Sequence, residues 1–231
     1  MILLYGGPTP NSRKVAILLE ELGLEWRLEF VDVMRGDQLT PAFLKLNPNN
    51  KTPVIVEDDG FTLAESGAIL WYLAARAGRF IPPEPRAQAV CHQWLMFQVS
   101  GVGPMVGQAA HFNAYAAEKH PYAIGRYNNE VTRLLGVVDR RLGESEHLAG
   151  EAYTVADIAT YPYTLRQAES RRAEFPNLAR WSDAIGARPA VRRGMEVGRE
   201  NVRQETIEGG LSGLTDEHRS ILFGERQYAP R

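Results

Sequence analysis

The chain has a single cysteine, Cys91, among its 231 residues. A single cysteine excludes an internal disulfide, and it also excludes the Cys-x-x-Cys pair of dithiol redox centres. Cys91 lies in the apolar stretch AVCHQWLMFQV, which favours a small buried side chain over a catalytic thiol. Because the sequence offers no structural disulfide, we expect the protein to work in the cytosol.

Long apolar runs and blocks of basic residues are also missing. No stretch approaches the ~20 consecutive apolar residues that span a bilayer, so we expect no membrane-spanning segment. The first residues have no basic region followed by an apolar core, so we expect no secretory leader. The formal net charge is −2 with interleaved signs, which argues against a nucleic-acid partner. The five histidines lack metal-ligand spacing, and these are His92, His111, His120, His147 and His218.

Residues 1–80 alternate between strand and helix patterns. The expected elements are a strand at 2–5, a helix at 11–23, a strand at 26–33, a short helix or turn at 40–48, two strands around Asp59-Gly60, and a helix at 65–78. The two longer helices end in glycine, and Asp-Gly is a common hairpin turn. This order predicts an α/β domain with a small mixed sheet.

The second part of the chain has no convincing strand pattern. Residues 81–88 contain three prolines in five residues and are predicted to be a linker. Helices are expected at 86–112, 122–144, 154–171, 178–187 and 190–206, and glycines and a proline after residue 100 predict a kink in the first. We therefore expect an all-helical domain at 89–206. A tail at 207–231 is expected to be irregular.

The turn Thr9-Pro10-Asn11-Ser12 precedes the first predicted helix. The start of a helix has unpaired N–H groups and a positive partial charge, which favour an anion. Thr9 or Asn11 could donate a hydrogen bond to a thiolate held there. The alternative is that one of them merely caps the helix.

Two further stretches suggest contacts to a small peptide. In NNKTPVIV, a cis bond before Pro53 would expose backbone groups to an extended ligand, and Lys51 could meet a carboxylate. The alternative is a strand that starts with proline. At a helix start, Glu65 and Ser66 could hold the ammonium and carboxylate of an amino acid, or Ser66 could only cap the helix. Thr154 and Asp157 are interpreted as a capping box with a folding role.

Together these stretches describe a peptide with a free amino-acid end, a thiol and a second carboxylate, which is glutathione. Over residues 1–205 the chain resembles a glutathione S-transferase, on the motifs NKTPVIV, ESGAILWYLA and TVADIA. It is most similar to the Nu-class, disulfide-bond-oxidoreductase type, through Thr9-Pro10-Asn11, GDQLTPAFLKLNPNNKTPV, QWLMFQVSGVGPMVGQ and YAIGRY. The resemblance implies a thioredoxin-like N-terminal domain and an all-α C-terminal domain. PNSR replaces the commoner PNG-K, and the tail has no counterpart that we can place.

The resemblance also implies roles for individual residues. Thr9 and Asn11 would lie at the glutathione sulfur, and Thr52 would pair its backbone with the cysteinyl unit ahead of cis-Pro53. The remaining contacts would go to the carboxylate-bearing ends: Gln38 and Lys51 to the glycyl end, Glu65 and Ser66 to the γ-glutamyl group, and Arg126 to a second glutathione or its carboxylates. Tyr5 is interpreted as a packing residue.

The sulfur would thus come from the cosubstrate rather than from the protein. The leading hypothesis is reduction of a small disulfide by the thiolate of glutathione. Conjugation of glutathione to an electrophile, or reduction of a peroxide, is the alternative within enzymes. A glutathione-sensing or scaffold protein without catalysis is the alternative outside them. The resemblance further implies a homodimer.

Overall fold

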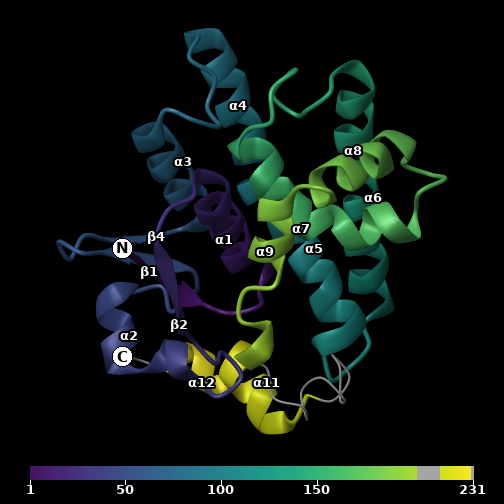
Figure 1. Cartoon of the computed structure of the whole chain (residues 1–231). Coiled ribbons are helices and arrows are strands. Elements are labelled where there is room, and N and C mark those ends of the chain that lie inside the picture. Colours follow the sequence, from purple (N-terminus) through teal and green to yellow (C-terminus); the bar gives the residue numbers. More distant parts are fainter. Residues whose placement is uncertain (202–213, 230–231) are drawn as a thin grey trace.

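The structure is a computed structural model that describes residues 1–201 and 214–229. The first domain contains the elements β1 (Ile2–Gly6), α1 (Pro10–Leu22), β2 (Trp26–Phe30), η1 (Asp37–Leu39), α2 (Pro41–Leu46), β3 (Val54–Glu57), β4 (Thr62–Ala64) and α3 (Ser66–Ala77). This order confirms the predicted α/β domain. Figure 1 shows the domain in purple and blue at one side of the molecule.

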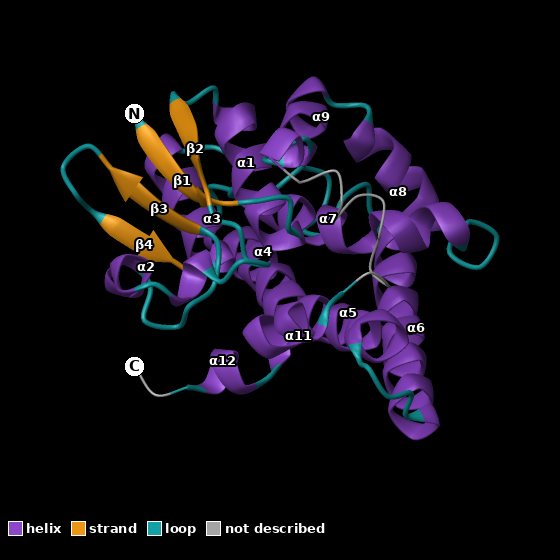
Figure 2. Cartoon of the chain, turned by 90° about the horizontal axis from the view of Figure 1, so that it is seen from below, coloured by secondary structure: helices purple, strands orange, loops and turns teal. Residues whose placement is uncertain are grey.

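The four strands form one mixed sheet in the order β2-β1-β3-β4. β1 and β2 are parallel, whereas β3 is antiparallel to both β1 and β4. Apolar residues of β1, α1 and α3 belong to the main core, and Val31, Phe43 of α2 and Val54 of β3 form a smaller cluster. Tyr5 packs against this smaller cluster, as predicted. In Figure 2 the sheet lies to one side of the helical domain.

The second domain is helical in its described residues. Its elements are α4 (Pro85–Phe97), the π-helical turn η2 (Gln98–Val102), α5 (Gly103–Ala110), the π-helical turn η3 (His111–Tyr115), α6 (Pro121–Glu144), α7 (Val155–Ser170), α8 (Pro176–Gly186), α9 (Pro189–Met195) and η4 (Arg199–Asn201). The two π-helical turns interrupt the first long helix near the predicted kink. The last four residues of the predicted linker are helical, because the Glu84 side chain caps α4 and Pro85 starts it.

A continuous core joins the two domains, and α1 is at its centre. α1 packs against α3 of its own domain and against α7 and α9 of the helical domain. The closest approach is at Gly194, where a Cβ would lie 2.5 Å from the backbone nitrogen of Ile17. Only glycine fits there. The packing fixes the start of α1 relative to the helical domain.

The C-terminal end differs from the sequence-based expectation. The helix predicted at 190–206 ends at Met195, and Gly198 follows with φ +67° before η4; residues 202–206 lie outside the described part. In the tail, the described residues are helical as α11 (Asp216–Phe223) and α12 (Glu225–Tyr228), so the prediction of an irregular tail is wrong there. Thr215 caps α11, and Ile221 of this helix is buried. None of the described helices is long and apolar enough to cross a membrane.

Candidate functional site

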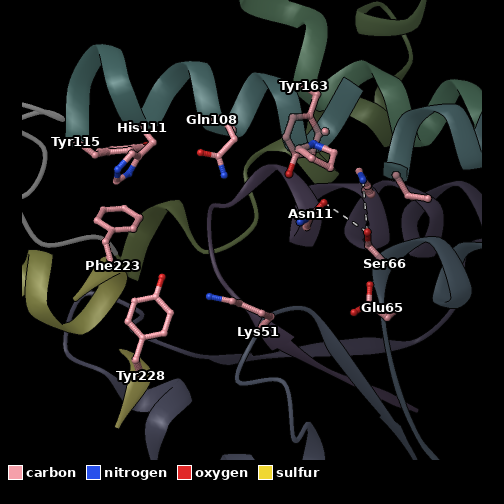
Figure 3. Close-up of a pocket in the computed structure, with 15 residues that line it drawn as sticks. Asn11, Lys51, Glu65, Ser66, Gln108, His111, Tyr115, Tyr163, Phe223 and Tyr228 are labelled. Carbon is pink, nitrogen blue, oxygen red and sulfur yellow. Dashed lines mark hydrogen bonds between the residues drawn. The ribbon is translucent and has the colours of Figure 1, made fainter. Parts of the chain in front are cut away.

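A cavity of about 670 Å³ lies where the two domains meet, and its lining comes from both. The first domain contributes the starts of α1 and α3, whereas the helical domain contributes α5, η3 and α7, and the tail contributes α11 and α12. An adjoining cavity of about 210 Å³ shares Asn11, Lys51, Glu65 and Ser66, and Thr52 and Pro53 complete its wall. Figure 3 shows the larger cavity. The structure thus brings six of the nine predicted site residues together.

At the start of α1, Thr9 and Asn11 have different roles. The Thr9 hydroxyl oxygen accepts from the Ser12 backbone N–H at 3.3 Å and donates to the Ser12 hydroxyl at 3.0 Å, so Thr9 is the helix cap. Asn11 lines both cavities. The capping alternative is therefore confirmed for Thr9, while Asn11 is the side chain of this turn that a ligand would meet.

The start of α3 lies beside the start of α1 at the cavity wall. Ser66 is buried, and its hydroxyl donates to the Asn11 Oδ1 at 3.4 Å. Because Oδ1 accepts this bond, the amide nitrogen of Asn11 remains as its donor group. Glu65 is exposed and has φ +69°, a conformation that costs a non-glycine residue about 1–3 kcal/mol. Such strain is concentrated at functional sites, which supports a ligand at this helix start.

Lys14 is a functional candidate that the sequence analysis missed. Its side chain is 1% exposed, and Nζ donates to Gln98 Oε1 at 2.6 Å and to Ser66 Oγ at 3.4 Å. Among the described residues no carboxylate forms an ion pair with it. Burial lowers the pKa of Lys14 from 10.5 to about 7, and the charge of Glu65 opposes this. A signal existed in the sequence, since Lys14 lies four residues before Leu18, on the apolar face of α1.

Tyr163 on α7 completes this buried polar group. Lys14 Nζ lies 4.9 Å from the centre of its ring. Burial raises the pKa of Tyr163 to about 12, and a hydrogen bond with Asn11 opposes the shift. The phenol is therefore protonated at neutral pH and can donate a hydrogen bond beside Asn11. Sequence spacing gave no signal for it, because Tyr163 and Asn11 are far apart in the chain.

Lys51, Thr52 and Pro53 form the opposite wall. The Thr52-Pro53 peptide bond is cis, as the sequence analysis expected. The Asn47 side chain donates to the Lys51 backbone oxygen at 2.7 Å and so holds the loop before the cis bond. The Lys51 side chain extends toward the cavity in Figure 3.

Three of the nine predicted site residues are absent from the described lining of these cavities, and these are Thr9, which caps α1, Gln38 and Arg126. Gln38 is buried, donates to the Val33 backbone oxygen at 3.2 Å, and has no partner for its Oε1. Arg126 lies on α6 with its side chain 56% exposed, and it forms an ion pair with Glu130 at 3.7 Å. Their contacts to glutathione stay predictions. Tyr5 is also outside the lining.

Comparison with known proteins agrees with this geometry. The N-terminal domain model of the glutathione S-transferases matches residues 9–76, and their C-terminal domain model matches residues 109–189. The chain is 46% identical over 199 residues to the disulfide-bond oxidoreductase YfcG of Escherichia coli, which covers 83% of this chain and 93% of that protein.

Solved structures of similar proteins contain glutathione. A glutathione transferase family member from Pseudomonas fluorescens, with two glutathione bound, has a TM-score of 0.80 and 43% identity, over 85% of this chain and 92% of that one. A glutathione transferase from Pseudomonas putida, with one glutathione disulfide bound per subunit, has a TM-score of 0.80 and 39% identity, over 84% and 90%. The chain belongs to the glutathione S-transferase family.

Proposed function

We propose that this protein is a glutathione-dependent thiol–disulfide oxidoreductase that reduces small disulfides. The observation that carries the proposal is the polar group at the start of α1. Asn11 lines the cavity there, and no thiol does, because Cys91 is fully buried in the core. The reacting sulfur is therefore that of glutathione. The relative named a disulfide-bond oxidoreductase supports the choice of reaction.

Glutathione would lie along the wall that the first domain forms. Its γ-glutamyl ammonium would meet Glu65, and its α-carboxylate would meet Ser66 and the first N–H groups of α3. Its cysteinyl unit would pair with the Thr52 backbone, and Lys51 would bind the glycyl carboxylate. Arg126 and Gln38 would act from outside the described lining.

The chemistry is an exchange between sulfur atoms. The thiolate of glutathione attacks one sulfur of the substrate disulfide, a new S–S bond forms, and the old one breaks to release a thiolate that takes a proton from water. A second glutathione attacks the mixed disulfide at the glutathione sulfur. The substrate is reduced to two thiols, and two glutathiones are oxidised to glutathione disulfide. Asn11 would stabilise the attacking thiolate by donating its amide N–H.

The test compares hydroxyethyl disulfide reduction with glutathione conjugation to a chloronitrobenzene. Reduction should be much faster, and Asn11→Ala should slow it by roughly 10–100-fold, the value of one charged hydrogen bond. Cys91→Ala is the control and should keep turnover within about twofold, although it can lower the melting temperature by leaving a small cavity.

Each alternative function has its own outcome in this test. Faster conjugation than reduction would show that the protein is a conjugating transferase instead. Glutathione binding without either turnover would favour a sensing or scaffold role. Loss of turnover in folded Cys91→Ala would contradict the cosubstrate as the source of the sulfur.

A further inference from the structure

The C-terminal helices α11 and α12 lie beyond residue 189, where the family match ends, and yet they reach the cavity. Phe223 of α11 and Tyr228 of α12 both line it. In Figures 1 and 2, α11 lies near α5 of the helical domain and α12 lies toward the first domain. The segment therefore contributes to a site whose other predicted residues all belong to the matched domains or the stretch between them.

The two helices contact both segments of the first domain that are predicted to meet the glycyl end of glutathione. Ile221 of α11 is 1% exposed, and its Cγ2 lies 3.5 Å from where a Cβ of Gly36 would be. Gly36 immediately precedes η1, the turn that contains Gln38. The second segment is the one that carries Lys51, and Gln227 of α12 contacts it. The C-terminal segment is thus packed where the glycyl carboxylate is expected.

The contact between Gln227 and Lys51 is a hydrogen bond to a neutral acceptor. In the orientation that satisfies both ends of its amide, Gln227 accepts from Lys51 Nζ at 3.1 Å and donates to the Ile221 backbone oxygen at 3.3 Å. The second bond ties the Gln227 side chain to α11, so its oxygen is held in place. At the other end of the lysine, the Asn47 side chain donates to the Lys51 backbone oxygen at 2.7 Å. Both ends of Lys51 are therefore held.

The charge of Lys51 is available to a ligand. Among residues 1–201 and 214–229, no carboxylate forms an ion pair with Lys51, and partial burial of its ammonium lowers its pKa. An ammonium has three N–H donors and Gln227 accepts from one of them, which leaves two for a ligand. Figure 3 shows the Lys51 side chain directed into the cavity toward Tyr228. A ligand carboxylate at this point would meet a cation that has no anionic partner of its own.

Holding Lys51 before the ligand arrives should increase affinity. Lys51 is exposed, so without a partner its long side chain would sample many rotamers, and ordering it on binding would oppose the ligand. The bond from Gln227 restricts these rotamers in the free protein, and such preorganisation reduces the loss of entropy on binding. Because the amide is neutral, it does not replace the ligand's carboxylate.

We propose that Gln227 is a positioning residue that holds the Lys51 ammonium where it binds the glycyl carboxylate of glutathione, so that the C-terminal segment makes the site selective for a ligand with this carboxylate. This inference rests on the proposed function, which assigns the glycyl carboxylate to Lys51. It adds a residue from outside the matched family domains to the recognition of glutathione.

Calorimetry on the full chain tests this role by comparing glutathione with its glycyl ethyl ester, which keeps the tripeptide and removes one charge. Wild type should bind glutathione at least about tenfold more tightly than the ester, the value of one charged hydrogen bond. Gln227→Ala and Gln227→Met should each reduce the glutathione-to-ester affinity ratio about threefold or more and leave ester affinity within about twofold. Gln227→Met keeps the length of the side chain and removes its hydrogen bonds, so it separates these bonds from packing.

A double-mutant cycle with Lys51→Met distinguishes positioning from a general effect on the fold. Lys51→Met should bring the affinity ratio close to one, and adding Gln227→Ala should then change it no further. In hydroxyethyl disulfide reduction, Gln227→Ala should raise the KM for glutathione and keep kcat within about twofold, because the glycyl end takes no part in the exchange of sulfur atoms. An equal effect of Gln227→Ala with and without Lys51 would overturn the proposal.

Gln167→Ala is the matched control, since Gln167 is a half-buried glutamine on α7 outside the lining of both cavities; it should leave the ratio unchanged. An unchanged ratio in both Gln227 variants would contradict the positioning role. Tighter glutathione binding in these variants would also contradict it, because the segment would then compete with the ligand for Lys51. Equal binding of glutathione and the ester to wild type would remove its basis, whereas failure of both ligands to bind would contradict the proposed function itself.

Discussion

Lys14 is the residue whose burial most needs an explanation. A buried ammonium without a carboxylate partner destabilises a fold, and its hydrogen bonds to Gln98 and Ser66 are to neutral groups. Such a charge is useful where a ligand brings the missing anion. In the proposed complex the γ-glutamyl carboxylate lies at Ser66, next to the ammonium. We therefore infer that Lys14 contributes to affinity for glutathione at a cost to the stability of the free protein.

Lys14→Met should make the free protein more stable at pH 7 by about 1–4 kcal/mol, because it removes a buried charge and keeps the volume. The effect should depend on pH. The pKa of Lys14 is about 7 in the folded protein against 10.5 ordinarily, so between these values the unfolded chain binds more protons. The free energy of unfolding of the wild type therefore rises with pH from about 7 to about 10, because the cost of burying this lysine falls as the unfolded chain also loses the proton. The advantage of Lys14→Met should shrink over that range.

The measurement is thermal or urea unfolding of wild type and Lys14→Met at pH 7 and pH 9.5, with glutathione affinity measured in parallel. The variant should bind glutathione at least tenfold more weakly. An equal stability difference at both pH values would show that Lys14 keeps an ordinary pKa. Unchanged affinity would show that Lys14 does not contribute to glutathione binding.

At the scale of the element, local signals predicted most of the fold. Gly23 and Gly78 end α1 and α3 in left-handed conformations, as expected from their positions after periodic apolar residues. The Thr154–Asp157 capping box at the start of α7 is confirmed. The structure adds contacts that the sequence did not reveal, since Asp157 also accepts from the Leu148 backbone N–H at 3.1 Å and from Trp181 Nε1 at 2.9 Å.

Asp157→Ala should destabilise the protein by about 3 kcal/mol, because it leaves the Leu148, Thr154 and Trp181 donors buried without an acceptor. For a chain of this size the melting temperature should fall by roughly 6–12 °C. Asp183→Ala is the matched control, since Asp183 is exposed and pairs with Arg172 at the surface. It should change the melting temperature little. Equal shifts in the two variants would contradict the importance of the buried acceptor.

At the scale of the whole molecule, the sequence predicted the part of the site that the first domain forms, but not the part that the helical domain and the tail form. The residues of the first domain lie in short motifs at helix starts, such as Asn11 and Ser66, and those motifs have local signatures. The opposite side depends on how α5, α7 and α11 pack, which no local pattern encodes. Tyr163, Phe223 and Gln98 were therefore missed, and the tail was expected to be irregular.

The quaternary structure is a prediction at the same scale. We expect a homodimer in which the first domain of each chain faces the helical domain of its partner. Two large apolar side chains support this arrangement: Phe61 in the β3–β4 hairpin is 42% exposed and Met96 on α4 is 41% exposed. They belong to different domains, so the expected dimer could bury each against the partner. Light scattering at micromolar concentration should give twice the chain mass of 25.8 kDa.

Phe61→Glu should shift this mass toward that of one chain, because a carboxylate would have to be desolvated in the interface. The change is at an exposed hairpin position, so circular dichroism should stay that of the wild type. A single-chain mass for the wild-type protein would reject the dimer. A dimer unaffected by Phe61→Glu would place the interface on another face and leave the two apolar side chains without a partner. A monomeric variant that still binds glutathione would assign the ligand's contacts to a single chain.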